Sequence, residues 1–426
     1  MKTAYKNCYI LDGSEQMQPQ SGLAVLVDGE KIAAIVPETA IPAGYAEVDL
    51  GGGYLMPGLI NLHIHLPGSG KPKKKQADTK KLVRLLTSNA LLRQIIVIIC
   101  KGAAKTQLMS GVTTVRTVGG VEAYDAMIRD MIADGKAVGP RILAGNMAVS
   151  VPGGHMAGSL AYEAHTPEEA ASYVRDIADS GADLIKLMIT GGVLDATAKG
   201  EPGALRMRPE LVKACCEEAH ARGLQVAAHV ESPEGVRVAL RNGVDTIEHG
   251  AKPDAEILEL FRKRNAALVA TLSPALPYAL FDPAISHVSE MEQFNGKVVF
   301  DGIVESAKAC LAAGIPVGLG TDTGCPYITH YDMWRELNYF RKFCGVSNAF
   351  ALYTATKRNA EIVGIDSVTG TIEPGKCADM IVCARNPLDD LSVLWELQAV
   401  IARGKRYDAP RVKKMANVER ELDKFL

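Results

Sequence analysis

Two histidines separated by a single residue, His63 and His65, close an apolar run that begins at Leu59. Side chains on a strand alternate between its faces, so both imidazoles would project from the same face. This spacing supplies half of a metal site, although a His-x-His pair alone is weak evidence. Further strand-like runs also end in residues of ligand type, which are Lys186, His229, His249 and Asp322. Such nitrogen and oxygen donors typically hold divalent cations that activate water.

Lys186 stands out because it interrupts an apolar run at residues 183–189. Burying an ammonium group is costly unless the charge is paired. Three arrangements would relieve that cost: an acidic neighbour, a lowered pKa, or reaction with CO2 to give a carbamate. A carbamate carries a negative charge and two oxygens, so it could bridge two cations. The residues alone leave the choice between an ion pair and a carbamate open.

The middle of the chain, residues 57–365, has to position these side chains. Short apolar runs alternate there with amphipathic stretches, several of which begin at Thr-Pro or Ser-Pro and end at glycine. Strand–helix alternation repeated eight times favours a closed (β/α)8 TIM-like barrel, in which the C-terminal ends of all strands meet at one mouth. The predicted strands are 59–64, 113–118, 141–144, 184–189, 225–229, 246–249, 267–271 and 316–320. The predicted helices are 167–180, 209–222, 233–242, 254–264 and 298–313.

The two ends of the chain have a different pattern. Short strand-like pieces separated by Gly, Asp and Pro turns fill residues 4–55, and similar pieces return between 370 and 407. This is typical of antiparallel β structure. We therefore expect a small composite β-sandwich domain built from residues 1–56 and 366–426, flanking an α/β barrel domain at 57–365.

Composition narrows the classes of partner and compartment. The formal net charge of the 426 residues is -2, which gives no reason to expect nucleic acid or a membrane as a partner. Nine scattered cysteines without a Cys-x-x-Cys motif, and no secretory signal, predict a cytoplasmic protein. The apolar run at 95–100 is too short to span a bilayer and predicts a buried helix segment. The lysine-rich loop at 68–81, with Lys71 to Lys75, is typical of a solvated loop, with a lid or an acidic-substrate surface as the alternative.

At this point the chain resembles the amidohydrolase superfamily over nearly its whole length. Within that superfamily it is most similar to the imidazolonepropionase-related group, which includes prolidase-like and arginine carboxypeptidase-like dipeptidases. The narrower likeness rests on Gly153-Gly154-His155, on residues 183–186 and on residues 235–250. The motifs that carry the broader likeness are residues 57–65, Lys186, His229, residues 246–250, residues 320–322 and the tail at 370–379.

The resemblance implies a binuclear metal centre, commonly of zinc. It implies that His63, His65 and Asp322 hold one ion, and that His229 and His249 hold the other. A carboxylated lysine at Lys186 and a hydroxide would bridge the two ions. Two cations lower the pKa of a shared water toward neutrality and so provide a nucleophile.

The same resemblance assigns two catalytic roles. Asp322 would take a proton from the nucleophile and later pass it to the leaving nitrogen. His155, in its glycine-rich loop, would stabilise the oxyanion that develops on the substrate carbonyl. The alternative for His155 is an ordinary loop histidine.

One position departs from the dipeptidase pattern. Relatives commonly carry a tyrosine two residues after the strand 5 histidine, where it helps to bind the substrate carboxylate, but this chain has Glu231. A carboxylate there would favour a cation or an amide donor in the substrate, or it could instead stabilise the start of the next helix. Arg206 and Arg208 could bind a substrate anion, or they could be ordinary surface charges.

These features predict a small-molecule hydrolase that cleaves C–N bonds, with a dipeptide or an N-acyl amino acid as the leading substrate. A cyclic-amide hydrolase or a deaminase of the same superfamily is the first alternative. Mononuclear deaminases tend to lack the strand 4 lysine and to carry a glutamate where this chain has Ser232. A non-catalytic scaffold is the alternative from another class. We also expect a homo-oligomer, since barrels of this kind often associate.

Overall fold

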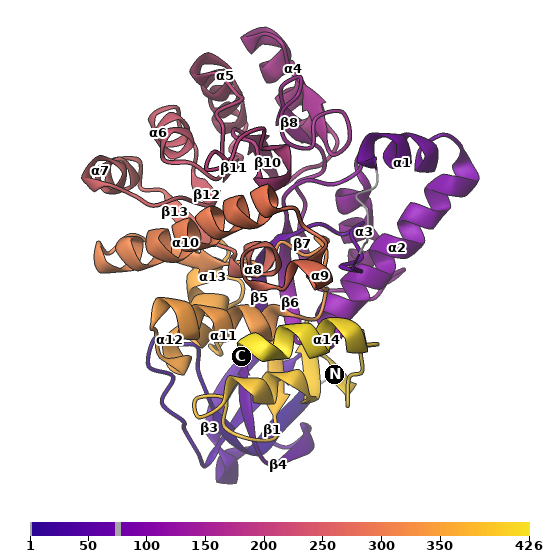
Figure 1. Ribbon diagram of the computed structural model, residues 1–426. Helices are drawn as coiled ribbons and strands as arrows, with labels where there is room; N and C mark the ends of the chain where they lie inside the picture. The colour runs from indigo at the N-terminus through magenta and orange to yellow at the C-terminus, as the bar shows by residue number, and fades with distance from the viewer. Residues whose placement is uncertain (1, 73–77) are drawn as a thin grey trace.

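A closed parallel barrel forms the centre of the computed structural model, which describes residues 2–72 and 78–426. Its eight strands confirm the predicted (β/α)8 class, and Figure 1 shows helices around the strands. The strands are β5 (Leu59–Ile64), β6 (Val112–Thr117), β7 (Arg141–Leu143), β10 (Leu184–Met188), β11 (Gln225–Val230), β12 (Thr246–His249), β13 (Ala267–Ala270) and β14 (Val317–Leu319).

Two seams join a three-stranded sheet, β5-β6-β7, to a larger sheet that runs from β14 to β10. At one seam the backbone N–H of Asp322 donates to the carbonyl of His63, with N and O 2.8 Å apart. At the other seam the N–H of Asp183 donates to the carbonyl of Ala144 at 2.7 Å. Two short strands, β8 (Ala148–Ser150) and β9 (Ala161–Glu163), extend the larger sheet beyond β10.

The predicted helices are present as α4 (Pro167–Asp179), α5 (Pro209–Ala221), α6 (Pro233–Arg241), α7 (Ala255–Arg264) and α10 (Glu290–Ala312). Thr166 and Ser232 cap α4 and α6, because each side-chain oxygen accepts a backbone N–H from the first turn. Helix α10 begins earlier than predicted because Ser289 and Glu292 form a capping box. The other α-helices are α1 (Thr79–Leu86), α2 (Ala90–Met109), α3 (Tyr124–Ala133), α8 (Leu272–Leu280), α9 (Pro283–Ser286), α11 (Met333–Cys344), α12 (Asn348–Tyr353), α13 (Asn359–Ile362) and α14 (Ala416–Leu422).

The apolar run at 95–100 is helical, as part of α2, but the prediction that it is buried was wrong. Ile95 is 41% exposed and Ile98 is 68% exposed, whereas Ile96 and Cys100 are buried. Helix α2 packs one side on α3 and β6 and turns the other side outward, so its apolar residues divide between core and surface. Among the described residues no single helix is long and apolar enough to cross a membrane; α1 and α2 together meet that condition only as a pair bent by 112°.

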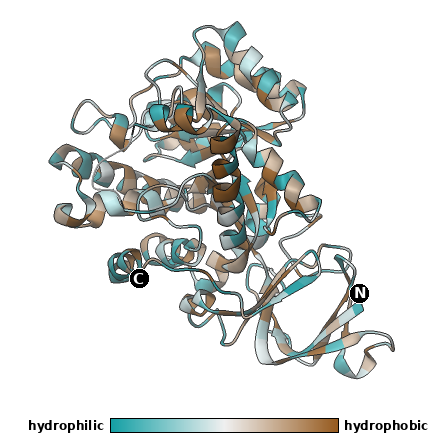
Figure 2. Cartoon of the chain, turned by 90° about the vertical axis from the view of Figure 1, so that its right-hand side faces the viewer, coloured by the Kyte–Doolittle hydropathy of each residue, from teal (hydrophilic) through white to brown (hydrophobic). Residues whose placement is uncertain are grey.

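Both ends of the chain contribute to one seven-stranded sheet, which Figure 2 shows below the barrel. Ile32 of β3 and Ile401 of β16 belong to one shared core, so the two ends of the sheet are packed together. The expected all-antiparallel pairing needs correction: β1 is parallel to β4, because residues 38–45 return the chain to the far edge of β1. The strands are β1 (Lys2–Ile10), β2 (Leu23–Asp28), β3 (Lys31–Pro37), β4 (Ala46–Pro57), β15 (Met380–Cys383), β16 (Leu397–Ala402) and β17 (Lys405–Asp408).

The last helix does not join this sheet. Glu419 of α14 forms an ion pair with the buried Arg335 of α11, with the two atoms 2.8 Å apart. Helix α14 thereby ties the C-terminus to a helix of the barrel. The domain limits expected at 56/57 and 365/366 stay a prediction.

Candidate metal centre

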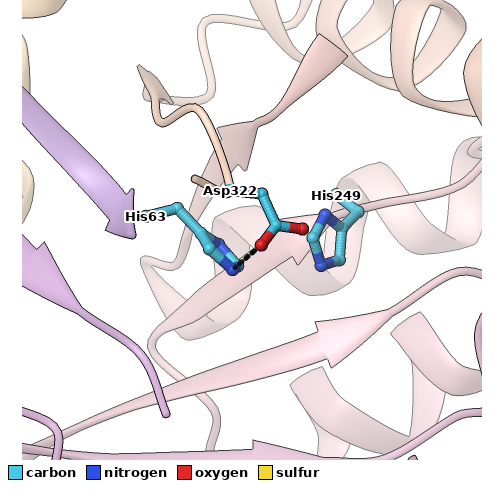
Figure 3. Close-up of side chains that lie close together, drawn as sticks. All are labelled: His63, His249 and Asp322. Carbon is cyan, nitrogen blue, oxygen red and sulfur yellow. Dashed lines mark ion pairs between the residues drawn. The ribbon is translucent and has the colours of Figure 1, made fainter. Parts of the chain in front are cut away.

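His63, His65 and Asp322 meet at the seam between β5 and β14. The histidines lie at the C-terminal end of β5, and Asp322 follows β14. Nε2 of His65 is 3.1 Å from Oδ1 of Asp322, and Nε2 of His63 is 3.6 Å from the same oxygen. Figure 3 shows the His63 ring and the Asp322 carboxylate pointing toward one another. The structure therefore brings together three of the predicted ligands from opposite ends of the barrel sequence.

His249, the last residue of β12, adjoins this group. One potential ligand atom from each of His63, His249 and Asp322 lies within 4.8 Å of the other two. The backbones of His249 and Asp322 are left-handed, with φ of 68° and 53°. Non-glycine residues adopt that conformation at a cost of about 1–3 kcal/mol each. The surrounding fold therefore holds both side chains at the mouth against local backbone preference.

A second group of potential ligands shares His249 with the first. Ligand atoms of His229, Glu231 and His249 also lie within 4.8 Å of one another. The rings of His229 and His249 have centroids 4.7 Å apart and are nearly perpendicular, at 71°. The two groups are thus adjacent, and His249 lies between them.

Lys186 is placed deep in the barrel on β10. Its residue is only 1% exposed, and its register partner on β11 is Ala227, two residues before His229. Within the described part of the chain, the Nζ atom of Lys186 has no hydrogen-bond partner. Burial lowers the pKa of this amine to about 8. The sequence left an ion pair and a carbamate open at Lys186. Among the described residues, Lys186 forms no direct ion pair.

Three of the four histidines at the site have protonation states that suit metal ligands. Burial, aided by the nearby Lys186 charge, lowers the pKa of His63 to about 4. Burial also holds the pKa values of His229 and His249 well below the usual range. At neutral pH these three imidazoles are uncharged, so each has a lone pair available. Burial also lowers the pKa of His65, but its contact with Asp322 more than offsets this and the net pKa is raised.

The donor set fits a metal centre because two of its buried polar atoms are left without ordinary hydrogen-bond partners. Oδ1 of Asp322 is buried and, apart from its ion pairs with His63 and His65, has no hydrogen-bond partner among the described residues; Nζ of Lys186 has none there either. Buried polar atoms are normally satisfied, and a carboxylate grouped with the uncharged imidazoles of His63 and His249 is what a metal site needs.

Glu248 and Arg116 support this centre, and sequence reasoning gave neither of them a role. Oε2 of Glu248 is 2.8 Å from Nδ1 of His63, and Nη2 of Arg116 donates to Oε1 of the same carboxylate at 2.6 Å. Arg116 also donates through Nη1 to the hydroxyl of Thr246 at 3.0 Å. Because Glu248 accepts the Nδ1 proton of His63, Nε2 of that ring is left to face the site. The signal that could have indicated this role is the position of Arg116, a charged residue inside the strand-like run of β6.

His155 lies beside the second group. Its ring stacks on that of His229, with centroids 4.2 Å apart and planes at 5°. Nδ1 of His155 is 2.6 Å from Oδ2 of Asp195, and that oxygen also accepts the backbone N–H of Gly192 at 2.9 Å. Asp195 therefore fixes the orientation of His155 over the mouth. Asp195 was not among the residues predicted from the sequence.

The two arginines considered for anion binding have different surroundings. Arg206 lies beside the His155 pair, where its Nη2 donates to the backbone carbonyl of Asp195 at 3.4 Å. Arg208 is on the surface and forms an ion pair with Glu210 at 3.1 Å. Arg208 is thus an ordinary surface charge, whereas Arg206 stays a candidate substrate contact.

The lysine-rich loop is only partly covered by the structure. Lys73, Lys74 and Lys75 lie outside the described residues, so the expected lid or solvated loop is not addressed there. At the edge of this segment the carbonyl of Gly70 accepts the backbone N–H of Tyr327 at 2.9 Å.

Known proteins share both the sequence pattern and this architecture. Among solved structures, a candidate prolidase from Bifidobacterium longum is 37% identical, with 99% of this chain and 98% of that chain covered and a TM-score of 0.88. A Xaa-Pro dipeptidase with methionine bound in its active site is 29% identical, with 96% and 100% covered and a TM-score of 0.84. The ochratoxinase of Aspergillus niger is 26% identical, covering 93% of this chain and 85% of that protein.

The family model of the amidohydrolase family matches residues 54–407, which include every candidate ligand described above. The relatives of this chain include a dipeptidase and deaminases, and a metal centre is a general property of the family. The chain belongs to the amidohydrolase family and is a hydrolase of C–N bonds.

Proposed function

We propose that this protein is a binuclear metal-dependent hydrolase of dipeptides or N-acyl amino acids. The observation that carries the proposal is the pair of adjacent donor groups that share His249, with the buried amine of Lys186 on the neighbouring strand. Similarity to a Xaa-Pro dipeptidase over 96% of this chain supports the choice of substrate.

Six side chains would hold the centre: His63, His65, Lys186, His229, His249 and Asp322. When bound, two divalent ions, with zinc as the first candidate, would acidify a shared water and polarise the substrate carbonyl. We propose that Lys186 carries a carbamate. The support for this is that the amine is buried and has no hydrogen-bond partner among the described residues. Conversion to a carbamate would replace this costly buried amine with an anion that can bind a metal ion.

The residues around the centre have distinct tasks in this proposal. Asp322 would accept the proton of the attacking water and return it to the leaving nitrogen, because its carboxylate lies between the two histidines of β5. His155 would donate a hydrogen bond from Nε2 to the developing oxyanion while Nδ1 stays paired with Asp195. That double donation requires a proton on each ring nitrogen. Arg206, which lies beside the pair of His155 and Asp195, is our candidate for a substrate contact.

The alternatives are a cyclic-amide hydrolase or deaminase of the same superfamily, and a non-catalytic scaffold. A cyclic-amide hydrolase would use the same donors, whereas a mononuclear deaminase is disfavoured by Lys186 and by Ser232 at the position of its usual glutamate. A non-catalytic scaffold is disfavoured because every donor position is filled.

The test is hydrolysis of a substrate panel by the purified protein, supplied with zinc or manganese. The panel contains dipeptides (Xaa-Pro dipeptides among them), N-acyl amino acids, lactams and aminopurines. Cleavage is followed by the ninhydrin reaction of new amino groups, and deamination by the release of ammonia. We expect turnover of dipeptides or N-acyl amino acids and its loss, by more than about 1,000-fold, in His63→Asn, since one metal ligand is removed.

His287→Asn is the matched control for that variant. His287 is exposed, and its left-handed backbone at φ 58° suits asparagine. Activity should be unchanged in this control. Exclusive turnover of lactams or aminopurines would refute the proposed substrate class, and full activity of His63→Asn would refute the site itself.

A further inference from the structure

Glu231 occupies the position at which this chain departs from dipeptidase relatives, and its surroundings identify a specific task. It follows His229 by two residues at the end of β11, so both side chains point to the same side of the strand. A carboxylate oxygen of Glu231 lies within 4.8 Å of ligand atoms of both His229 and His249. Glu231 therefore faces the second donor group directly.

The backbone of Glu231 is held on both sides. Its N–H donates to the hydroxyl of Thr190 at 3.0 Å. On the other side Gly203 approaches so closely that a Cβ on that glycine would lie 2.3 Å from the carbonyl oxygen of Glu231. A pinned backbone restrains the point from which the side chain starts, which favours a preorganised ligand position.

One oxygen of the Glu231 carboxylate lacks a protein partner. Its Oε2 atom is buried and has no hydrogen-bond partner among the described residues. The guanidinium of Arg206 donates to the backbone carbonyl of Asp195. Asp322 and Asp195 add negative charge nearby, and a bound cation would neutralise this group of carboxylates.

The geometry points to Glu231 as a direct ligand of the second metal ion, together with His229 and His249. Two histidines and one carboxylate are a common donor set of catalytic zinc sites, which leave a position for water. Glu231 would thus give the second ion an anionic side-chain ligand in addition to any contribution from Lys186. This inference rests on the proposed metal centre, but it assigns to Glu231 a role other than substrate binding.

The experiment is a calorimetric titration of the metal-free full-length protein with zinc. Absorption spectra of the Co2+-substituted protein are the second readout. Wild-type protein should bind two ions. In Glu231→Gln, affinity for one ion should fall by more than about 100-fold, beyond the range that loss of an outer-shell partner causes. Binding of the other ion should persist, and the Co2+ spectrum should lose the contribution of one site.

Two further variants make the result decisive. Glu234→Gln is the control, because Glu234 lies three residues on, at the surface, with its side chain 60% exposed. It should bind both ions as the wild type does. Glu231→His keeps a donor at the position, so it should regain at least part of the lost affinity, and it replaces Glu231→Gln if circular dichroism shows that variant to be unfolded.

The failures of the two proposals look different. If the wild-type protein binds no ion, the proposed metal centre fails. If the wild type binds two ions and both Glu231 variants bind two ions with unchanged affinity, only the ligand role of Glu231 is refuted, and a substrate contact takes its place.

Discussion

The carboxylate of Glu248 determines which nitrogen of His63 faces the metal centre. It is completely buried and joins His63 to Arg116, which in turn donates to the carbonyl of Leu62 at 2.7 Å. The His63 ring is therefore held by groups from β5, β6 and β12 together. Outer partners of this kind orient a ligand and raise its basicity.

We predict that Glu248→Gln weakens zinc binding by about 10- to 100-fold, because the amide cannot hold the His63 proton as a carboxylate does. It should also lower the free energy of unfolding by about 3 kcal/mol, since the buried Arg116 loses its counter-charge. Calorimetric zinc titration and urea denaturation measure the two effects separately. A loss of stability with unchanged zinc affinity would show that Glu248 has only a structural role.

The seam between β5 and β14 decides whether the first donor group assembles. Gly320 follows β14 and passes against His63: a Cβ at Gly320 would lie 2.4 Å from Cβ of His63 and 2.6 Å from its backbone nitrogen. Glycine is required there because the two strand ends approach more closely than any side chain allows. The same close approach brings Asp322 beside the β5 histidines.

We predict that Gly320→Ala displaces His63, lowers the free energy of unfolding by about 1–3 kcal/mol and removes most metal binding. Gly102→Ala is the control, because a Cβ there meets nothing within 4 Å on the exposed side of α2. That change should be neutral or stabilising by about 0.5–1 kcal/mol. Thermal denaturation with and without zinc tests both variants, and a zinc-dependent shift of normal size in Gly320→Ala would contradict the importance of the seam.

The elements of the barrel could be predicted from sequence because their signals are local. Apolar runs bounded by glycine, together with Thr-Pro and Ser-Pro starts, located the strands and several helices. The histidines and Asp322 could be named because each lies at or just after the end of such a run, and Lys186 because it interrupts one. Glu248 and Asp195 were missed because their roles depend on partners far away in sequence, as His63 and Glu248 are 185 residues apart.

At the scale of the whole molecule, the terminal sheet and the metal centre lie at opposite ends of β5. Strand β4 ends at Pro57 and β5 begins at Leu59, so the sheet joins the barrel at the start of that strand. His63 and His65 lie at its other end, about 20 Å away for six residues at the usual rise. The ion pair of Arg141 with Asp379, 3.3 Å apart, adds a second connection between sheet and barrel.

Pairing across the whole molecule was the least predictable level. The parallel pairing of β1 with β4 depends on where the chain crosses after β3, which the strand pattern does not encode. The exposed apolar residues of α2 were predicted to be buried for a similar reason: hydrophobicity indicates a preference for burial but not which neighbour supplies it.

Metal content matched to activity is the measurement that tests the central claim most directly. Elemental analysis of the purified protein should find two divalent ions per chain, with zinc foremost. Chelation should remove the ions, abolish hydrolysis and lower the melting temperature, and added zinc should restore all three. Undiminished hydrolysis by a chain shown to carry no divalent metal would contradict the account.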